Sequence, residues 1–267
     1  MNDITLGQYI FADSIIHKLD PRVKIICTFL LLITIFLIRD VIGYGFLLIF
    51  LAIAVGLSKV PPRLVIRSLR PLIWILVFTF IINLFFTRSG DVLVQFGPVS
   101  ITSGGVQQSV FMALRLMFLV TGTSILTLTT TPMALTDGIE KLLSPLKVIR
   151  FPAHELAMMM SIALRFIPTL LDESQKIMKA QMARGADFES GNIFQRAKAM
   201  VPLLVPLFVS AFRRAEDLAM AMESRCYHGD EGRTRMNVLH FHRCDGIALA
   251  IMCAFMASIL AWRNVYA

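Results

Sequence analysis

Charged residues are scarce in this chain. Asp, Glu, Lys and Arg together make up 16% of its 267 residues, whereas about a quarter is typical of soluble domains. In their place 56% of the residues are hydrophobic and the mean hydropathy is +0.70. This composition excludes a disordered regulator, which needs high charge and few apolar residues, and it indicates a membrane protein.

The motifs of several enzyme and carrier classes are absent. No Gly-Lys dipeptide occurs, so the phosphate-binding loop of P-loop ATPases is missing and we expect no nucleotide hydrolysis by this chain. His154-Glu155 begins like a zinc-protease helix, but Met158 stands where the second histidine must bind the metal. The predicted spans contain no histidine and no carboxylate, which argues against an intramembrane protease and a proton-coupled carrier. We expect no cofactor.

Metal and nucleic-acid binding are weakly indicated. The candidate metal ligands fall close together at Cys226, His228, His240, His242 and Cys244. Their spacing matches no common zinc module, and the glycines and charges between them fit a solvated loop equally well. The net charge of +8 is distributed between apolar runs rather than on a basic face with interleaved aromatics, so we expect no nucleic-acid partner.

Long uncharged apolar runs predict an all-α membrane protein with about five transmembrane helices. The runs lie at 25–38, 41–57, 71–87, 109–131 (with Arg115 inside) and 246–262. Several are short for a hydrocarbon core about 30 Å thick, so flanking residues are expected to extend them. Arg115 either snorkels out of the membrane or pairs with a partner subunit.

The basic residues predict the orientation. With a cytoplasmic amino terminus, most of the 26 Lys and Arg fall on the cytoplasmic side, and Arg39, Arg88 and Arg263 are left outside. The positive-inside rule therefore predicts a multi-pass protein of the cell membrane with a cytoplasmic amino terminus and an external carboxyl terminus.

The segment between the fourth and fifth runs is too long for a plain loop. Apolar periodicity over 154–186 predicts one long helix, bent at Pro168, and a second helical stretch runs from about 193 to Cys226. We divide the chain into a membrane domain (1–131), a cytoplasmic helical domain (132–245) and a final transmembrane helix with an external end (246–267). The alternative makes 154–171 a further span, with Arg165 and Pro168 in its inner half.

Methionines gather in this helical domain. Eight of the 15 lie between Met158 and Met222. Methionine adapts its shape and suits a surface that meets changing partners. The alternative is that these side chains fill a helical core.

Several stretches resemble the transmembrane T components of energy-coupling factor (ECF) transporters, and the resemblance covers nearly the whole chain. They are Gly7-Gln8-Tyr9, Asp13-Ser14, His17, Leu19-Asp20-Pro21-Arg22, Leu126-Thr127-Leu128-Thr129-Thr130-Thr131-Pro132 and Ala163-Leu164-Arg165-Phe166-Ile167-Pro168. Two short motifs complete the set, Ala183-Arg184-Gly185 and Ser224-Arg225-Cys226, each at the carboxyl end of a predicted helix. The second motif departs from the Ala-Arg-Gly form but keeps the arginine.

The resemblance implies a scaffold subunit. Residues 132–245 would carry two coupling helices, and each motif arginine would dock in a groove of one of two ATP-binding ABC ATPase subunits, identical or different. Guanidinium suits this role because it stays charged and makes forked bonds to carboxylates. The alternative has each arginine simply neutralising the negative end of its own helix.

The resemblance also implies a third partner, a membrane-embedded substrate-binding S component, and uptake of vitamins or other micronutrients. The length favours the shared type, which serves several S components. We expect the S component to contact the Met-rich helix at Met159, Met160, Ala163, Phe166 and Pro168. The competing hypothesis is a self-contained secondary carrier or channel.

Overall fold

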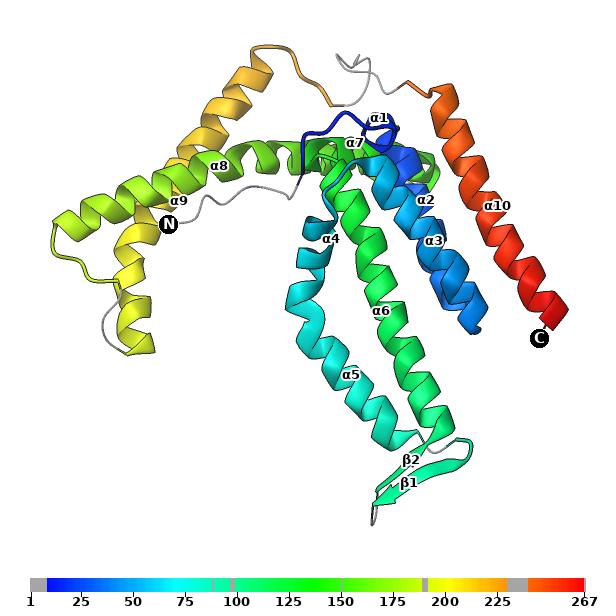
Figure 1. Ribbon diagram of the computed structural model, residues 1–267. Coiled ribbons are helices and arrows are strands. Elements are labelled where there is room, and N and C mark those ends of the chain that lie inside the picture. Colours follow the sequence, from blue (N-terminus) through cyan, green and yellow to red (C-terminus); the bar gives the residue numbers. More distant parts are fainter. Residues whose placement is uncertain are drawn as a thin grey trace. The chain divides into compact units, whose positions relative to one another are not determined.

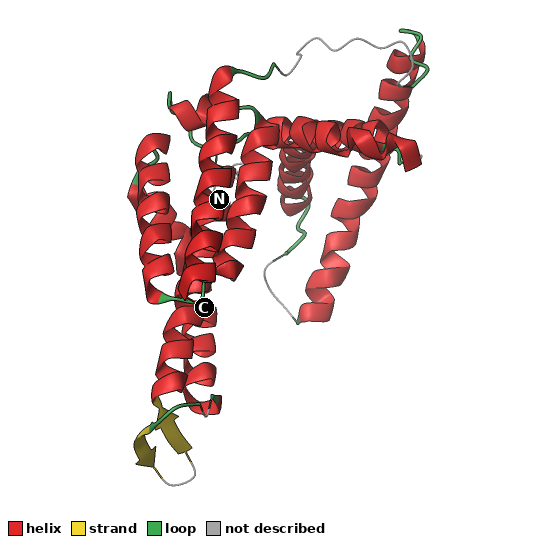
Figure 2. Ribbon diagram, turned by 90° about the vertical axis from the view of Figure 1, so that its right-hand side faces the viewer, coloured by secondary structure: helices red, strands yellow, loops and turns green. Residues whose placement is uncertain are grey.

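The computed structural model describes residues 9–87, 89–96, 99–149, 151–188, 192–229 and 240–266. The chain forms two compact units. The first unit comprises Met1–Ile139 and Leu239–Ala267, and the second comprises Glu140–Val238. Helices dominate both (Figures 1 and 2), which confirms the all-α fold class.

The first unit contains a bundle of long helices and one small β-hairpin at the end of α5 and α6 (Figure 1). Its elements are α1 (Ile15–Lys18), α2 (Pro21–Leu37), α3 (Val41–Ser58), α4 (Pro62–Leu69), a 3₁₀ turn (Arg70–Leu72), α5 (Ile73–Phe86), β1 (Val92–Phe96), β2 (Val99–Thr102), α6 (Ser103–Thr129), most of α7 (Pro132–Leu143) and α10 (Arg243–Tyr266). The strands β1 and β2, which were not predicted from the sequence, pair antiparallel, with Phe96 opposite Val99.

Two helix starts follow from a capping residue placed before proline. Asp20 precedes Pro21 at the start of α2, and its carboxylate accepts a hydrogen bond from the backbone N–H of Arg22 at 2.9 Å. Thr131 precedes α7 in the same way, and its hydroxyl accepts from the N–H of Ala134 at 3.2 Å. Proline suits this first-turn position because its missing N–H would have no helical partner.

Five of the described helical segments are long and apolar enough to cross a membrane. They are Val41–Ser58, Pro62–Phe86, Ser103–Thr129, Ala153–Ala183 and Arg243–Asn264. The number agrees with the predicted count, but the set differs. Helix α2 covers the predicted first span with only 17 residues, slightly fewer than the ~20 needed to span the bilayer core without tilt or thinning. The segment 153–183, which contains the alternative span 154–171, meets the criterion by length and composition.

The core of the first unit forms where α2 packs between α6 and α10. Its buried cluster consists of Leu31, Ile35, Ile38, Tyr44, Leu47, Leu51, Phe118, Met252 and Ile259. Many large apolar side chains instead face outward, with Trp74 82% and Phe86 81% exposed. An outer surface of this kind suits lipid rather than water.

Arg115 binds the end of a neighbouring helix. Its guanidinium Nη2 donates to the backbone carbonyl of Ile38 at 3.3 Å, and its Cζ lies 5.7 Å from the centroid of the Phe36 ring. Ile38 is the C-cap of α2, where the helix dipole places partial negative charge. The charge of Arg115 therefore has a partner within this chain.

The second unit is built on two 31-residue helices, α8 (Ala153–Ala183) and α9 (Ile193–Glu223), which follow the end of α7 and a 3₁₀ segment (Ser144–Ile149). The two long helices predicted in this region are present. Helix α8 continues through Pro168, and α9 continues through Pro202 and Pro206.

Candidate functional site

The two long helices of the second unit cross as an antiparallel pair (Figure 1). At the crossing, Glu173 of α8 forms an ion pair with Arg214 of α9, with 2.8 Å between Oε2 and Nη2, and accepts a hydrogen bond from the hydroxyl of Ser210. Further along α8, Gln181 contacts the earlier residue Pro202 of α9. The pairing runs in opposite directions along the two helices, so their carboxyl ends point away from each other.

A proline in α9 explains the contact of Gln181. In a regular helix the carbonyl of Pro202 would accept from the N–H of residue 206. Residue 206 is also proline and has no N–H, so this carbonyl lacks its helical donor. The amide Nε2 of Gln181 donates to it at 3.4 Å. The carbonyl that lacks a donor inside α9 thus forms a polar contact between the two helices.

The first arginine motif forms the end of α8. The N–H of Ala186 bonds to the carbonyl of Gln181 and the N–H of Gly185 to that of Met182, both at 3.0 Å. Gly185 has a φ of +89°. This pattern is a Schellman cap, in which the residue after the C-cap takes the left-handed conformation. Arg184 is the C-cap residue itself, and it is exposed.

The second motif forms the same cap at the end of α9. The N–H of Tyr227 bonds to the carbonyl of Met222 at 3.1 Å, and the N–H of Cys226 bonds to that of Glu223 at 2.9 Å. Arg225 stands in the C-cap position and is exposed, as Arg184 is. The two motifs therefore present their arginines on equivalent backbone geometry, although their flanking residues differ.

Cys226 occupies the position that Gly185 has in the first motif. Its φ is +55°, in the left-handed region where a side chain costs roughly 1–2 kcal/mol and glycine costs nothing. This explains why a glycine is the natural third residue of such a motif. The cysteine retains the cap at a cost in stability.

The motif arginines are also equidistant from the crossing. Arg184 follows Glu173 by eleven positions, and Arg225 follows Arg214 by the same number. We call the segments 173–184 of α8 and 214–225 of α9 the two arms. At 1.5 Å per residue each arm is about 16 Å long. The ion pair at the crossing joins equivalent positions of the two arms, so the hairpin carries two matched arginine ends on opposite sides of one contact.

The residues predicted to meet an S component lie on the surface of α8. Met159 and Met160 are 54% and 55% exposed, Ala163 and Pro168 are exposed, and Phe166 is half-buried. Of the eight clustered methionines, Met158, Met178 and Met222 are half-buried and the others are exposed. The methionines of this unit thus present apolar surface rather than filling a core.

A second apolar face lies on α9 and was missed from the sequence. Its exposed members are Val201, Val205, Phe208 and Phe212. They recur at intervals of four, three and four residues, which places them on one side of the helix. That spacing was the available signal, and the prolines within the same stretch obscured it.

The histidine and cysteine positions give no metal site in the part of the chain that the structure describes, where no group of three or more His, Cys, Asp or Glu is placed to hold an ion. His154, in the sequence that resembles a zinc-protease helix, is buried and its Nδ1 lies 3.0 Å from Oε1 of Glu140. His228 contacts the backbone carbonyl of Cys226.

Comparison with known proteins identifies the family. Residues 12–236 match the model of the CbiQ family, described as cobalt transport protein. The chain is 56% identical over 258 residues to an energy-coupling factor transporter transmembrane protein EcfT of Thermosediminibacter oceani, covering 97% of this chain and 95% of that one. Proteins of the same name from Ruminiclostridium cellulolyticum and Bacillus subtilis are 53% and 51% identical, over 100% and 90% of this chain and 99% and 90% of theirs.

The matched ranges cover both units and the positions of both arginine motifs. They confirm that the chain is a non-catalytic, multi-pass membrane subunit rather than an enzyme. The chain belongs to the EcfT family, the transmembrane components of bacterial ECF transporters.

Proposed function

We propose that this subunit couples ATP binding and hydrolysis by two partner ABC ATPases to reorientation of a membrane-embedded, substrate-binding S component. The observation that carries the proposal is the matched pair of arginine ends. Two equal arms, each ending in an exposed C-cap arginine, suit a pair of ATPase subunits that offer equivalent grooves.

The geometry of the hairpin favours transmission of movement. A capped helix is stiff, and each arginine is held at a fixed backbone position by two cap hydrogen bonds. Forked guanidinium–carboxylate bonds would fix the direction of each contact as well as its strength. When the two ATPases approach or separate, their grooves would shift the two arms about the contact between Glu173 and Arg214.

The exposed apolar residues of α8 supply the second half of the coupling. Met159, Met160, Ala163, Phe166 and Pro168 would form an adaptable contact with the S component, since methionine side chains change rotamer at little cost. Such a surface suits the shared type of T component, which serves several vitamin- or micronutrient-binding S components in turn. We assign the amino terminus to the cytoplasm and the carboxyl terminus to the outside, on the distribution of Lys and Arg.

The test uses the assembled complex purified through a tag on this chain. Arg184→Ala and Arg225→Ala should each weaken retention of the ATPase subunits, and the double variant should lose them. Truncating one partner of a buried charge pair costs enough to weaken binding roughly 30-fold or more. Arg196→Ala serves as the control because Arg196 is an exposed arginine of α9 outside both motifs.

The alternative role of the arginines gives a different result. If each guanidinium only neutralises its own helix end, the variants would lose a little stability and retain both ATPases as the Arg196→Ala control does. Normal ATPase retention and normal uptake in the double variant would overturn the proposal.

A further inference from the structure

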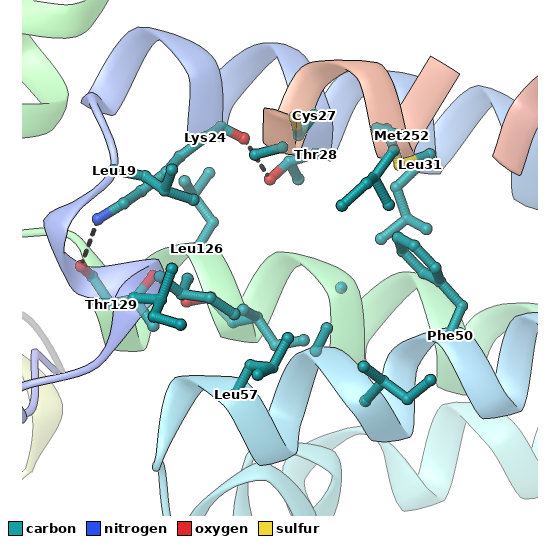
Figure 3. A pocket seen from close by; sticks show the side chains of 18 of the residues that line it. Leu19, Lys24, Cys27, Thr28, Leu31, Phe50, Leu57, Leu126, Thr129 and Met252 are labelled. Atoms are coloured by element: carbon teal, nitrogen blue, oxygen red, sulfur yellow. Dashed lines mark hydrogen bonds between the residues drawn. The ribbon is translucent and has the colours of Figure 1, made fainter. Parts of the chain in front are cut away.

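The first unit contains an apolar pocket of about 500 Å³ that the coupling mechanism does not use. Four helices line it, α2, α3, α6 and α10, together with α1 at one end. Figure 3 shows Leu19, Lys24 and Thr129 at that end and Leu31, Phe50 and Met252 at the other. All the lining residues belong to the same compact unit.

Beyond the far end of the pocket, aromatic rings of α3 and α10 contact each other. Phe50 stacks on Phe255 with 4.3 Å between ring centroids, and Phe46 meets Trp262 edge-on at 6.3 Å. Toward the other end the lining side chains of these two helices are exposed, with Ile53 at 57% and Ile247 at 59%. The pocket therefore has a side opening between α3 and α10, on the outer surface of the unit.

The pocket occupies one end of every helix that lines it. It contacts the first turns of α2 and α10 and the last turns of α3 and α6. Along α10 the lining runs from Cys244 to Met252, which is about 12 Å of helix. Half of the hydrocarbon core is about 15 Å thick, so the pocket is about as deep as one leaflet.

Its depth distinguishes between apolar occupants. A transmembrane helix of a partner subunit would cross both leaflets of the hydrocarbon core, whereas the lining of this pocket covers about one leaflet. A single flexible hydrocarbon chain matches that depth and would reach the pocket from the leaflet beside it.

The polar end of the pocket is already satisfied within the protein. The ammonium of Lys24 donates to the carbonyls of His17 and Thr129 at 3.1 and 2.9 Å, and the carboxylates of Asp245 and Asp20 act on its charge. Two of the three N–H donors of this amine are thus used within the protein, and the two carboxylates offset its charge, so it attracts a lipid phosphate only weakly. The walls, not a charged group, would select the ligand.

We infer that this pocket binds one acyl chain of a membrane phospholipid, drawn from the leaflet in which α2 begins and α6 ends, with little preference for the headgroup. The bound acyl chain fills the space between α3 and α10 and so forms part of the packing of the first unit. The inference does not depend on the proposed coupling function.

The test uses the complete transporter complex reconstituted with phosphatidylethanolamine that carries a photoactivatable diazirine in one acyl chain. After illumination, adducts should concentrate on the peptides that contain residues 50–57 and 244–252. A phosphatidylglycerol probe with the same chain should label these peptides equally. A strong difference between the two probes would contradict selection by the apolar walls.

Matched variants show whether the pocket itself captures the acyl chain of the lipid. Ala54→Phe fills the pocket from α3 and should abolish the adducts, whereas Ala52→Phe, two residues away on the exposed surface of the same helix, should retain them. Ala248→Phe and Ala250→Phe form the equivalent pair on α10 in case the first pair fails to assemble. Adducts spread evenly over all exposed helices, unchanged by Ala54→Phe, or absent from the complete complex would overturn the inference.

Discussion

Asp245 connects two helix starts that are far apart in the sequence, and its removal should destabilise the first unit. Its carboxylate is fully buried and accepts two backbone hydrogen bonds of 2.7 Å, one from Asp20 at the start of α2 and one from His242 at the start of α10. Its charge also acts on Lys24, which is 7% exposed. Both partners of the carboxylate are N–H groups at helix amino ends, where unpaired donors are concentrated.

The magnitude follows from these contacts. Each hydrogen bond to a charged group contributes about 1.5–3 kcal/mol, and breaking a buried charge pair costs about 3–5 kcal/mol. Because these contributions overlap, we expect Asp245→Ala to cost about 4 kcal/mol. For a chain of this size each kcal/mol lowers Tm by about 2–4 °C, so the expected shift is roughly 10 °C.

The assay is thermal unfolding of the purified complex in detergent. Asp40→Ala is a matched control, because Asp40 also precedes a membrane helix but is exposed and makes no side-chain cap hydrogen bond. Its Tm should stay within about 2 °C of the wild-type value. In a double-mutant cycle, Lys24→Met combined with Asp245→Ala should cost less than the sum of the two single changes. If the Asp245→Ala complex has the same Tm as the Asp40→Ala complex, the buried carboxylate does not hold α2 and α10 together.

Three further predictions concern helix packing, the motif caps and pH. Gly105→Ala should lower Tm, because a Cβ there would lie 2.9 Å from the carbonyl oxygen of Thr87. Such a clash costs about 1–3 kcal/mol. Gly45→Ala is the control and should leave Tm unchanged, because open space surrounds Gly45. Cys226 and Gly185 both have positive φ, which glycine adopts more readily than other residues. Cys226→Gly should therefore slow hydrogen exchange at the end of α9, and Gly185→Ala should speed it at the end of α8. Unchanged exchange in both variants would contradict the cap assignment. Burial lowers the pKa of His17, whose Nε2 donates to the carbonyl of Ile10. The unfolded chain therefore takes up the proton first, and the free energy of unfolding should fall as pH drops below about 6.5. His17→Gln should reduce this dependence of stability on pH, and an unchanged dependence would refute the assignment.

Local sequence signals account for the helices and for one of the two C-terminal caps. Asp20-Pro21 and Thr131-Pro132 marked helix starts because a capping oxygen and a first-turn proline act within a few residues. Gly185 carries a comparable signal at a helix end, because glycine takes the positive φ of a Schellman cap at little cost. The cap at Cys226 had no such signal, since cysteine rarely takes the left-handed conformation, and only the repeated arginine suggested it.

Contacts between distant segments were not predictable. The bond from the N–H of Asp20 to Asp245 joins residues 225 positions apart, and no local periodicity records such a pairing. The pocket depends likewise on how four helices pack, not on any one of them. The β-hairpin was missed because its strands have only four or five residues, too few for an alternating pattern to stand out.

The equality of the two arms was present in the sequence but had no meaning until the helices were paired. Glu173 and Arg214 are separated by the same number of residues as the two motif arginines. A sequence offers many equal spacings, and the ion pair at the crossing shows which of them is structural.

The central claim, that this subunit couples two ATPases to a substrate-binding partner, is tested most directly by isolating the tagged chain from gently solubilised native membranes. Mass spectrometry would identify its partners, and the bound ATPase activity would be assayed in the same sample. We predict recovery of two ATP-binding subunits, or two copies of one, together with a small hydrophobic substrate-binding protein. Recovery of the chain alone, active in transport without nucleotide, would contradict the account.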